Sequence, residues 1–129
     1  MTPSRPYLIR ALYEWIVDNG LTPYVLINAE YPEVVVPGQY VENGKIVLNI
    51  NPSAVQNLLL GNQSLELDAR FSGSPMHVYV PIMAVLAIYA RENGKGMVFN
   101  EEEYDGDEPP PSGGDDETKN KKPQLRVVK

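Results

Sequence analysis

The sequence contains no cysteine and only one histidine among its 129 residues. The absence of cysteine excludes disulfides, thiolate metal sites and thiol nucleophiles. A Ser-His-Asp mechanism would have to be built around the single imidazole, His77. The acidic runs at 101–105 and 113–117 lack the ligand spacing of a calcium loop, and the glycines form no phosphate-binding motif. We therefore expect no catalysis, no metal and no cofactor.

Long apolar runs and an excess of positive charge are also missing. The longest apolar run, at 80–90, is too short to cross a bilayer, and the first ten residues lack the apolar core of a secretory signal. We expect a soluble cytoplasmic protein. Residues 1–100 carry six Lys or Arg and eight Asp or Glu, and residues 101–129 carry five and nine. A nearly neutral folded part counts against RNA or DNA binding, which normally requires a basic surface.

A helix is predicted over about 6–19, because Pro6 suits a first turn and Asn19-Gly20 suits a C-terminal cap. Its charged residues are four positions apart and form one narrow stripe: Arg10, Glu14 and Asp18. The remaining apolar arc covers roughly 240°, against the ~100° that a single packing contact requires. The simplest partner for the part of the apolar arc that its own domain does not cover is a second copy of the helix. The alternative is a helix sunk deep within its own domain.

The chain after Gly20 is typical of β-structure. Strands are expected at 24–29, 65–71, 76–80 and 97–99. Asn43-Gly44 predicts a type I′ turn within a hairpin over 39–50, since that turn needs positive φ at both central positions. A second helix is expected over about 81–93. The sum predicts an α+β domain, mainly β with two helices, built on a small barrel or sandwich.

The composition changes at residue 100. The segment 105–122 is acidic, rich in Pro and Gly and without aliphatic side chains, so it is expected to be a disordered linker after a folded domain over 1–104. It would span about 25 Å as a flexible coil. The last seven residues, "PQLRVVK" at 123–129, contain three aliphatic side chains that a solvating tail does not need. They predict a docking peptide, the alternative being an unselected terminus.

Four segments together carry a resemblance to a known family: "RPYLIRALYEWIVDNGLTPY", "NGKIVLNI", "AVLAIYARENGKGMVF" and "LRVVK". They resemble stringent starvation protein B (SspB), a family of adaptors that hand ssrA-tagged polypeptides to the ClpXP protease. The likeness runs over 5–104 and returns at 123–129. It implies an Sm-like β fold, a homodimer formed through the first helix, and a groove that takes the tag in extended form. It also implies that the C-terminal peptide docks on the N-terminal domain of ClpX.

The family's peptide site involves the stretches that match "NPSAVQN" and "DARF". The resemblance implies that Ala69 must be small for a peptide to lie against it, and that Arg70 pairs with acidic groups of the tag, which reads Ala-Ala-Asn-Asp-Glu-Asn-Tyr in many bacteria. The implied groove residues are Ala54, Asn57, Ala69, Arg70 and Phe71, and adjacency on the next strand adds His77 and Tyr79. The implied ClpX-docking residues are Leu125, Arg126, Val127, Val128 and Lys129. The implied dimer contacts are Leu8, Leu12 and Trp15.

Two other classes of function stay open at this point: an Sm-like RNA-binding module and a hydrolase built around His77. Alternation along 65–71 by itself favours plain core positions for Ala69 and Phe71. The same pattern on the next strand favours a half-exposed structural role for His77. Only the family resemblance points these side chains toward a ligand.

Overall fold

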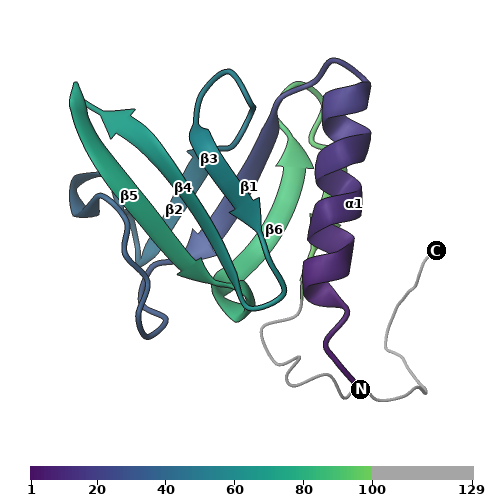
Figure 1. Cartoon of the computed structure of the whole chain (residues 1–129), viewed down its shortest axis with the longest axis horizontal. Coiled ribbons are helices and arrows are strands. Elements are labelled where there is room, and N and C mark those ends of the chain that lie inside the picture. The colour runs from purple at the N-terminus through teal and green to yellow at the C-terminus, as the bar shows by residue number, and fades with distance from the viewer. Residues whose placement is uncertain (100–129) are drawn as a thin grey trace. The chain divides into compact units, whose positions relative to one another are not determined.

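The structure, a computed structural model, describes residues 1–99 (Figure 1). Within this range the chain forms one α-helix and seven strands. In chain order the elements are α1 (Arg5–Asp18), β1 (Pro23–Asn28), η1 (Gly38–Tyr40), β2 (Lys45–Asn49), β3 (Gln56–Leu60), β4 (Ser64–Phe71), β5 (Ser74–Pro81), η2 (Ile82–Ala84), β6 (Val85–Ala90) and β7 (Gly96–Val98), where η marks a turn of 3₁₀-helix. The predicted linker, 105–122, and docking peptide, 123–129, lie outside the described residues.

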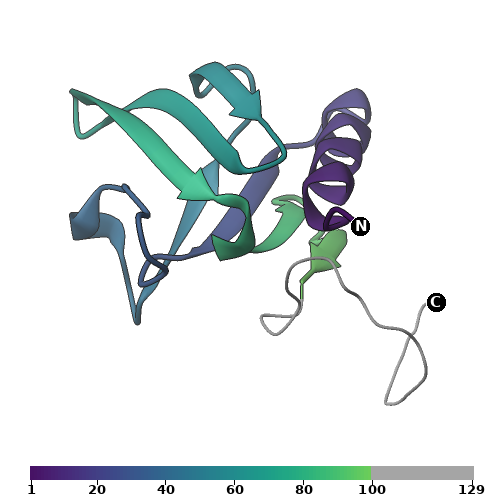
Figure 2. The ribbon, with the colours of Figure 1, turned by 60° about the horizontal axis from the view of Figure 1, so that its bottom comes forward.

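The strands form two antiparallel sheets, with the orders β2-β1-β6-β7 and β3-β4-β5. The helix α1 packs on β6, β1 and β3. Figures 1 and 2 show the β4–β5 hairpin on the side away from α1. The main core side chains come from both sheets and the helix: Ile9, Ile16, Val25, Ile27, Ile46, Leu48, Leu65, Leu67, Val78 and Val80. The domain is therefore mainly β, as predicted, but its two sheets do not close into a barrel.

The predicted first helix is confirmed. Its end is a Schellman motif, in which the Gly20 N–H donates to the Val17 carbonyl at 2.9 Å and the Leu21 N–H donates to the Ile16 carbonyl at 3.0 Å. One face is buried, whereas Tyr7 and Trp15 are 48% and 49% exposed. The Tyr7 hydroxyl accepts a bond from Asn62, in the turn between β3 and β4, at 3.4 Å. The helix is therefore not sunk within its own domain, and part of its wide apolar arc faces outward.

The four predicted strands are confirmed as β1, β4, β5 and β7. The I′ turn is confirmed by φ values of +54° at Asn43 and +76° at Gly44, with Glu42 and Lys45 bonding each other's backbone. The prediction of a strand in the first arm of that hairpin is wrong, because η1 and a single bridge lie there instead. Tyr40 turns toward the β4–β5 hairpin instead, with its ring centroid 5.9 Å from that of Phe71.

The second predicted helix, over 81–93, is also wrong. Residues 82–84 form η2 and residues 85–90 form β6, a central strand paired with both β1 and β7. Val85, Leu86, Ala87 and Ile88 are all buried, so no polar alternation marks the segment as a strand. A continuous apolar run of this kind fits a buried helix equally well. Asn93-Gly94 belongs to the turn between β6 and β7, not to a helix end.

Strand β3 has no clear signal in the sequence. Its pairing with β4 is irregular, with a register shift between Gln56 and Leu59, and Asn57 has a φ of +57°. Leu59 is 51% exposed, so apolar side chains do not mark a single buried face. The strand exists because it pairs with β4, and this pairing carries the chain into the second sheet.

Candidate functional site

Two adjoining hollows lie where the β4–β5 hairpin meets the 52–56 segment. The first, of about 590 Å³, is lined by Pro52, Ser53, Ala54, Val55, Gln56, Asp68, Ala69, Arg70, Pro75, Met76 and His77. The second, of about 240 Å³, lies between β2 and β4 and is lined by Tyr40, Ile46, Val47, Leu48, Asn49, Ala54, Val55, Leu67, Ala69, Arg70 and Phe71. Because they share four residues, we treat them as one depression and call it the groove.

The 50–55 connection is held in shape by asparagine side chains. The Asn49 side chain accepts a bond from the Asn51 N–H at 2.9 Å, and the Asn51 side chain accepts one from the Ser53 N–H at 2.9 Å. The Ala54 N–H donates to the Asn51 carbonyl at 2.8 Å. Such Asx turns reverse the chain locally without help from distant residues. They place Ala54 and Val55 between the two sheets, at the junction of the two hollows.

Small side chains mark the middle of the groove and aromatic rings mark one end. Ala54 and Ala69 line both hollows, and Ala69 is only partly buried against the core. At the end of the second hollow, the Tyr40 ring packs on Phe71 and the Tyr40 hydroxyl bonds the Ser72 hydroxyl. The arrangement leaves room beside the alanines and offers an apolar surface beyond them.

A cluster of polar side chains covers the outward face of β4 and β5 at the first hollow. Asp68 and His77 are directly opposite each other in the strand register. His77 Nδ1 lies 2.7 Å from Asp68 Oδ1, and its Nε2 lies 3.1 Å from Glu66 Oε1. Asn57 donates to the second oxygen of Asp68 at 2.8 Å. Both imidazole nitrogens therefore face carboxylates, which leaves neither nitrogen to activate a serine.

These contacts change the pKa values of all three ionisable groups. Hydrogen bonds to Asp68 and then to Glu66 raise the pKa of His77, because both carboxylates stabilise the imidazolium. The bonds from Asn57 and then His77 lower the pKa of Asp68. For Glu66 the pKa is lowered by the Ser64 hydroxyl first and His77 second. The cluster thus favours two carboxylates and one imidazolium.

A free strand edge borders the second hollow. The Ile50 N–H donates to the Pro23 carbonyl, and the Ala29 N–H donates to the Gly44 carbonyl. In the antiparallel register of β1 and β2, every second residue of β2 therefore bonds β1. By this alternation, the N–H and C=O of Val47 and Asn49 point away from β1, toward the open edge of β2. The Val47 side chain is 44% exposed. The edge offers backbone donors and acceptors beside an apolar hollow.

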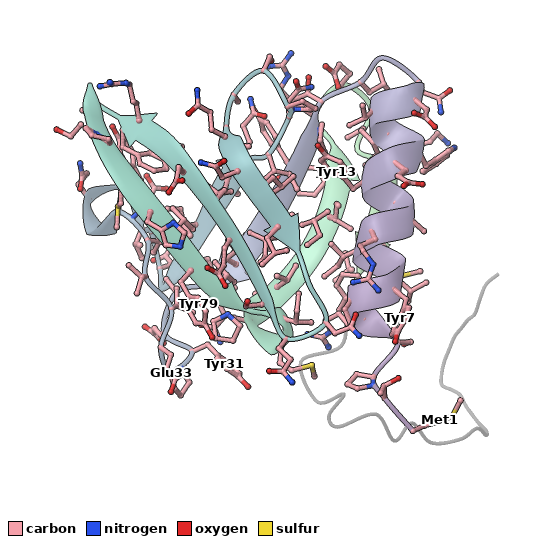
Figure 3. All side chains as sticks on the ribbon, in the orientation of Figure 1. Met1, Tyr7, Tyr13, Tyr31, Glu33 and Tyr79 are labelled. Atoms are coloured by element: carbon pink, nitrogen blue, oxygen red, sulfur yellow. The ribbon has the colours of Figure 1, made fainter. Side chains whose placement is uncertain are left out.

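The structure brings together most of the residues predicted for the groove. Ala54, Ala69, Arg70, Phe71 and His77 line one or both hollows. Asn57 is outside the lining but holds Asp68 in place. Tyr79 lies outside both hollows, where its backbone pairs with Val35; Figure 3 shows its side chain near Tyr31 and Glu33.

Two groove residues were not among those predicted to contact a peptide, although the resemblance marks Asp68 as a position where relatives often have Asn. Tyr40 reaches the groove only because η1 replaces the predicted strand. Asp68 occupies an ordinary outward position of an alternating strand, and its partners come from the neighbouring strands: His77 on β5 and Asn57 on β3. Arg70 was anticipated, and its guanidinium bonds the Gly73 carbonyl of the hairpin turn at 2.9 Å while the residue lines both hollows.

Within residues 1–99, no group of three or more His, Cys, Asp or Glu side chains could hold a metal ion, and this includes Glu66, Asp68 and His77. None of the helices in the same range is both long and apolar enough to span a membrane. On α1, the predicted dimer residues Leu8 and Leu12 are partly buried against the core, and Trp15 is about half exposed. The predicted docking residues 125–129 lie beyond the described range.

Comparison with known proteins identifies the family. A family profile described as stringent starvation protein B matches residues 3–129. The chain belongs to the stringent starvation protein B family. The stringent starvation protein B homolog of Haemophilus influenzae (strain ATCC 51907 / DSM 11121 / KW20 / Rd) is 52% identical to it over 102 residues, which cover 79% of this chain and 68% of the relative. The resemblance to SspB seen in the sequence is thus confirmed.

Proposed function

We propose that this SspB family member, with the Sm-like fold that the family resemblance implies, is a cytoplasmic adaptor. It binds ssrA-tagged polypeptides in the groove and tethers them to the ClpXP protease, which increases their degradation. The observation that carries the proposal is the family match over residues 3–129, which includes both the groove residues and the C-terminal peptide. No covalent step is required of the adaptor itself.

The geometry of the groove supports binding of an extended peptide. The free edge of β2 can bond the peptide backbone as an added strand does, while the neighbouring hollow receives alternate side chains. Ala54 and Ala69 leave space for the peptide to approach, and the Tyr40–Phe71 pair supplies an apolar end. Arg70 places a cation at the junction of the two hollows, where acidic groups of a tag would be attracted.

Tethering would depend on the C-terminal peptide and on dimerisation. In the proposed complex, residues 123–129 dock on the N-terminal domain of ClpX, through Leu125, Arg126, Val127, Val128 and Lys129. Two protomers joined through α1 would present two such peptides. Joining weak contacts through linkers can raise avidity by ~10²–10⁴ without a new contact, provided that the linker spans the sites.

The groove is tested by replacing Ala69 with glutamine. The longer side chain would occupy the space beside Ala54, so we expect affinity for a fluorescently labelled tag peptide to fall about tenfold or more, which corresponds to a loss of roughly 1.4 kcal/mol. Fluorescence anisotropy measures the affinity, and thermal unfolding shows whether the fold is retained. Ala29→Gln is the matched control, because Ala29 also packs partly against the core but lies outside both hollows.

The groove assignment fails if the loss of affinity in Ala69→Gln is accompanied by a large fall in its melting temperature. It also fails if both variants bind like the native protein. Native protein that binds no tag peptide, but retains RNA in a salt-sensitive manner, would contradict the adaptor proposal itself.

The tether is tested by deleting residues 123–129. We expect tag-peptide affinity to stay unchanged, because the groove lies within residues 40–77. Stimulation of ClpXP degradation of a tagged reporter at low concentration should be lost, because avidity depends on the second contact. The reporter assay at saturating substrate is the internal control, since tethering matters least there. Full stimulation by the truncated protein at low concentration would refute the tether.

A further inference from the structure

The Glu66–His77–Asp68 cluster has no role in the proposed function so far. It is nevertheless built by the fold: Asp68 and His77 are register partners, and Asn57 fixes the second oxygen of Asp68 from the irregular start of β3. Asp68 and His77 both line the first hollow, next to Arg70. Any peptide in that hollow lies beside a histidine whose charge can change near neutral pH.

We infer that His77 is a specificity-determining residue of the groove, which favours acidic peptides while it is an imidazolium and loses that preference when it becomes neutral. This inference rests on the proposed peptide-binding function and adds that the preference for an acidic peptide depends on the charge of His77. It assigns no chemistry to His77, only control of the charge on the groove wall.

The charge balance of the wall gives the direction of the effect. With His77 protonated, the charges of Glu66, Asp68, Arg70 and His77 sum to zero; with His77 neutral they sum to −1. An acidic peptide therefore meets a less repulsive wall at lower pH. Because both carboxylate bonds raise the pKa of His77 above its ordinary 6.5, the favourable state extends upward from that pH and is lost as pH rises through the raised pKa.

The other groups that face His77 do not reverse this direction. On β4 the charged groups are Glu66 and Asp68, whose pKa values are lowered, so both stay ionised throughout the range in which His77 titrates, and Arg70, whose guanidinium is always charged. The 52–56 segment has no charged residue. At the other edge of β5, Val35 pairs with Tyr79. Glu33, two residues before Val35, is the carboxylate on that side, and Figure 3 shows it near Tyr79.

The test measures the affinity of the full-length protein for two peptides by fluorescence anisotropy, from about pH 6 to about pH 9, a range that brackets histidine titration. One peptide is the acidic tag sequence, and the other has its Asp and Glu replaced by Asn and Gln. We expect the acidic peptide to bind about threefold to tenfold more tightly at the low end, the size of one unit charge acting near a protein surface. The amide peptide should show no such change.

The chain has a single histidine, so one imidazole signal in the NMR spectrum follows His77 directly. Protonation and peptide binding are linked reciprocally, so saturating acidic peptide must move the His77 titration midpoint upward by the same factor that separates the two affinities. The amide peptide should leave the midpoint unchanged. Agreement between the two measurements excludes a pH effect from the peptide or from another part of the protein.

Three variants locate the effect. His77→Gln should bind the acidic peptide with the same affinity at every pH. Asp68→Asn removes the 2.7 Å partner and should move the midpoint of the His77 titration to lower pH, more than Glu66→Gln does at 3.1 Å. Glu33→Gln is the matched carboxylate control, and it should leave the midpoint unchanged.

The outcomes separate this inference from the proposed function. If neither peptide binds at any pH, the peptide-binding function is wrong. If both bind but neither depends on pH, or both depend on it equally, the peptide-binding function stands and the role of His77 is refuted. A pH dependence that persists in His77→Gln also refutes it.

Discussion

Arg5 is a cation with no exposed surface, at the start of α1. Its Nη1 donates to the carbonyls of Met83 and Val85, both at 3.1 Å, and its guanidinium lies 5.1 Å from the centre of the Phe99 ring. These two acceptors belong to the η2–β6 junction, where the chain returns to the first sheet. A single side chain therefore joins the helix to the point at which the second predicted helix is replaced by a strand.

Replacing Arg5 with methionine keeps much of the side-chain volume but removes the donors. We expect the free energy of unfolding to fall by ~2–4 kcal/mol, because buried acceptors left without partners cost about 1–3 kcal/mol each. Urea denaturation measures the change.

Arg10→Met is the matched control on the same helix. Arg10 bonds one carbonyl, that of Leu60, at 3.0 Å and is only partly buried, so its loss should cost about 1 kcal/mol or less. Equal costs for the two substitutions would show that the Arg5 bonds do not hold the η2–β6 junction.

At the scale of elements, a carboxylate joins the start of β1 to the end of β6. Glu92 accepts the backbone N–H of Thr22 at 2.9 Å and the Thr22 hydroxyl at 2.7 Å, while the Arg91 N–H donates to the Thr22 carbonyl at 2.9 Å. The bond from the Thr22 N–H, followed by that from its hydroxyl, lowers the pKa of Glu92 to about 2. The ionised form is thus the one that the folded protein favours.

The bonds between Glu92 and Thr22 predict a pH-dependent contribution to stability. Because the folded pKa is below the ordinary 4.5, the contribution is complete above that pH and is lost as pH falls toward 2. We expect Glu92→Gln to lower the melting temperature at neutral pH, and the gap from the native protein to shrink as the pH approaches the lowered pKa.

Thermal scans at a series of pH values test this prediction, with Thr22→Val as a graded control that removes the hydroxyl but keeps the N–H. A gap that stays constant between neutral pH and the lowest pH would show that the carboxylate charge is not responsible.

At the scale of the whole molecule, α1 leaves two large aromatic side chains partly exposed to solvent. Trp15 and Tyr7 are about half exposed, while Leu8 and Leu12 are partly buried against the core. The structure therefore separates the three predicted dimer residues: Trp15 can contact a partner without supporting its own core, but Leu12 contributes to its own core as well.

We expect Trp15→Lys to shift the protein from dimer toward monomer at micromolar concentration, because the substitution places a charge where two helices would meet. Analytical ultracentrifugation measures the association, and circular dichroism shows whether each protomer stays folded. Val35→Lys is the matched control, since Val35 is 46% exposed but lies beside Tyr79 on the second sheet. A native protein that sediments as a monomer would contradict dimerisation through α1.

The sequence by itself determined the features that depend on short-range rules. The Pro6 start and Asn19-Gly20 end define α1, the Asn43-Gly44 pair defines a turn with positive φ, and alternation defines β4 and β5. The residues that the family resemblance singles out in "NPSAVQN" and "DARF" lie around one groove, because these two segments lie where the chain passes from one sheet to the other. Each of these signals acts over a few residues, so it can be read without knowing what packs against them.

Only the tertiary structure decided the rest. Residues 85–90 are a strand because β1 and β7 are available on both sides, and Gln56–Leu60 is a strand because β4 is beside it. Tyr40 reaches the groove through its contact with Phe71, and His77 acquires its two carboxylates through the register of β4 with β5. Pairing and register bring together residues that are distant in the chain, and no local pattern of apolar and polar residues specifies which partner will be there.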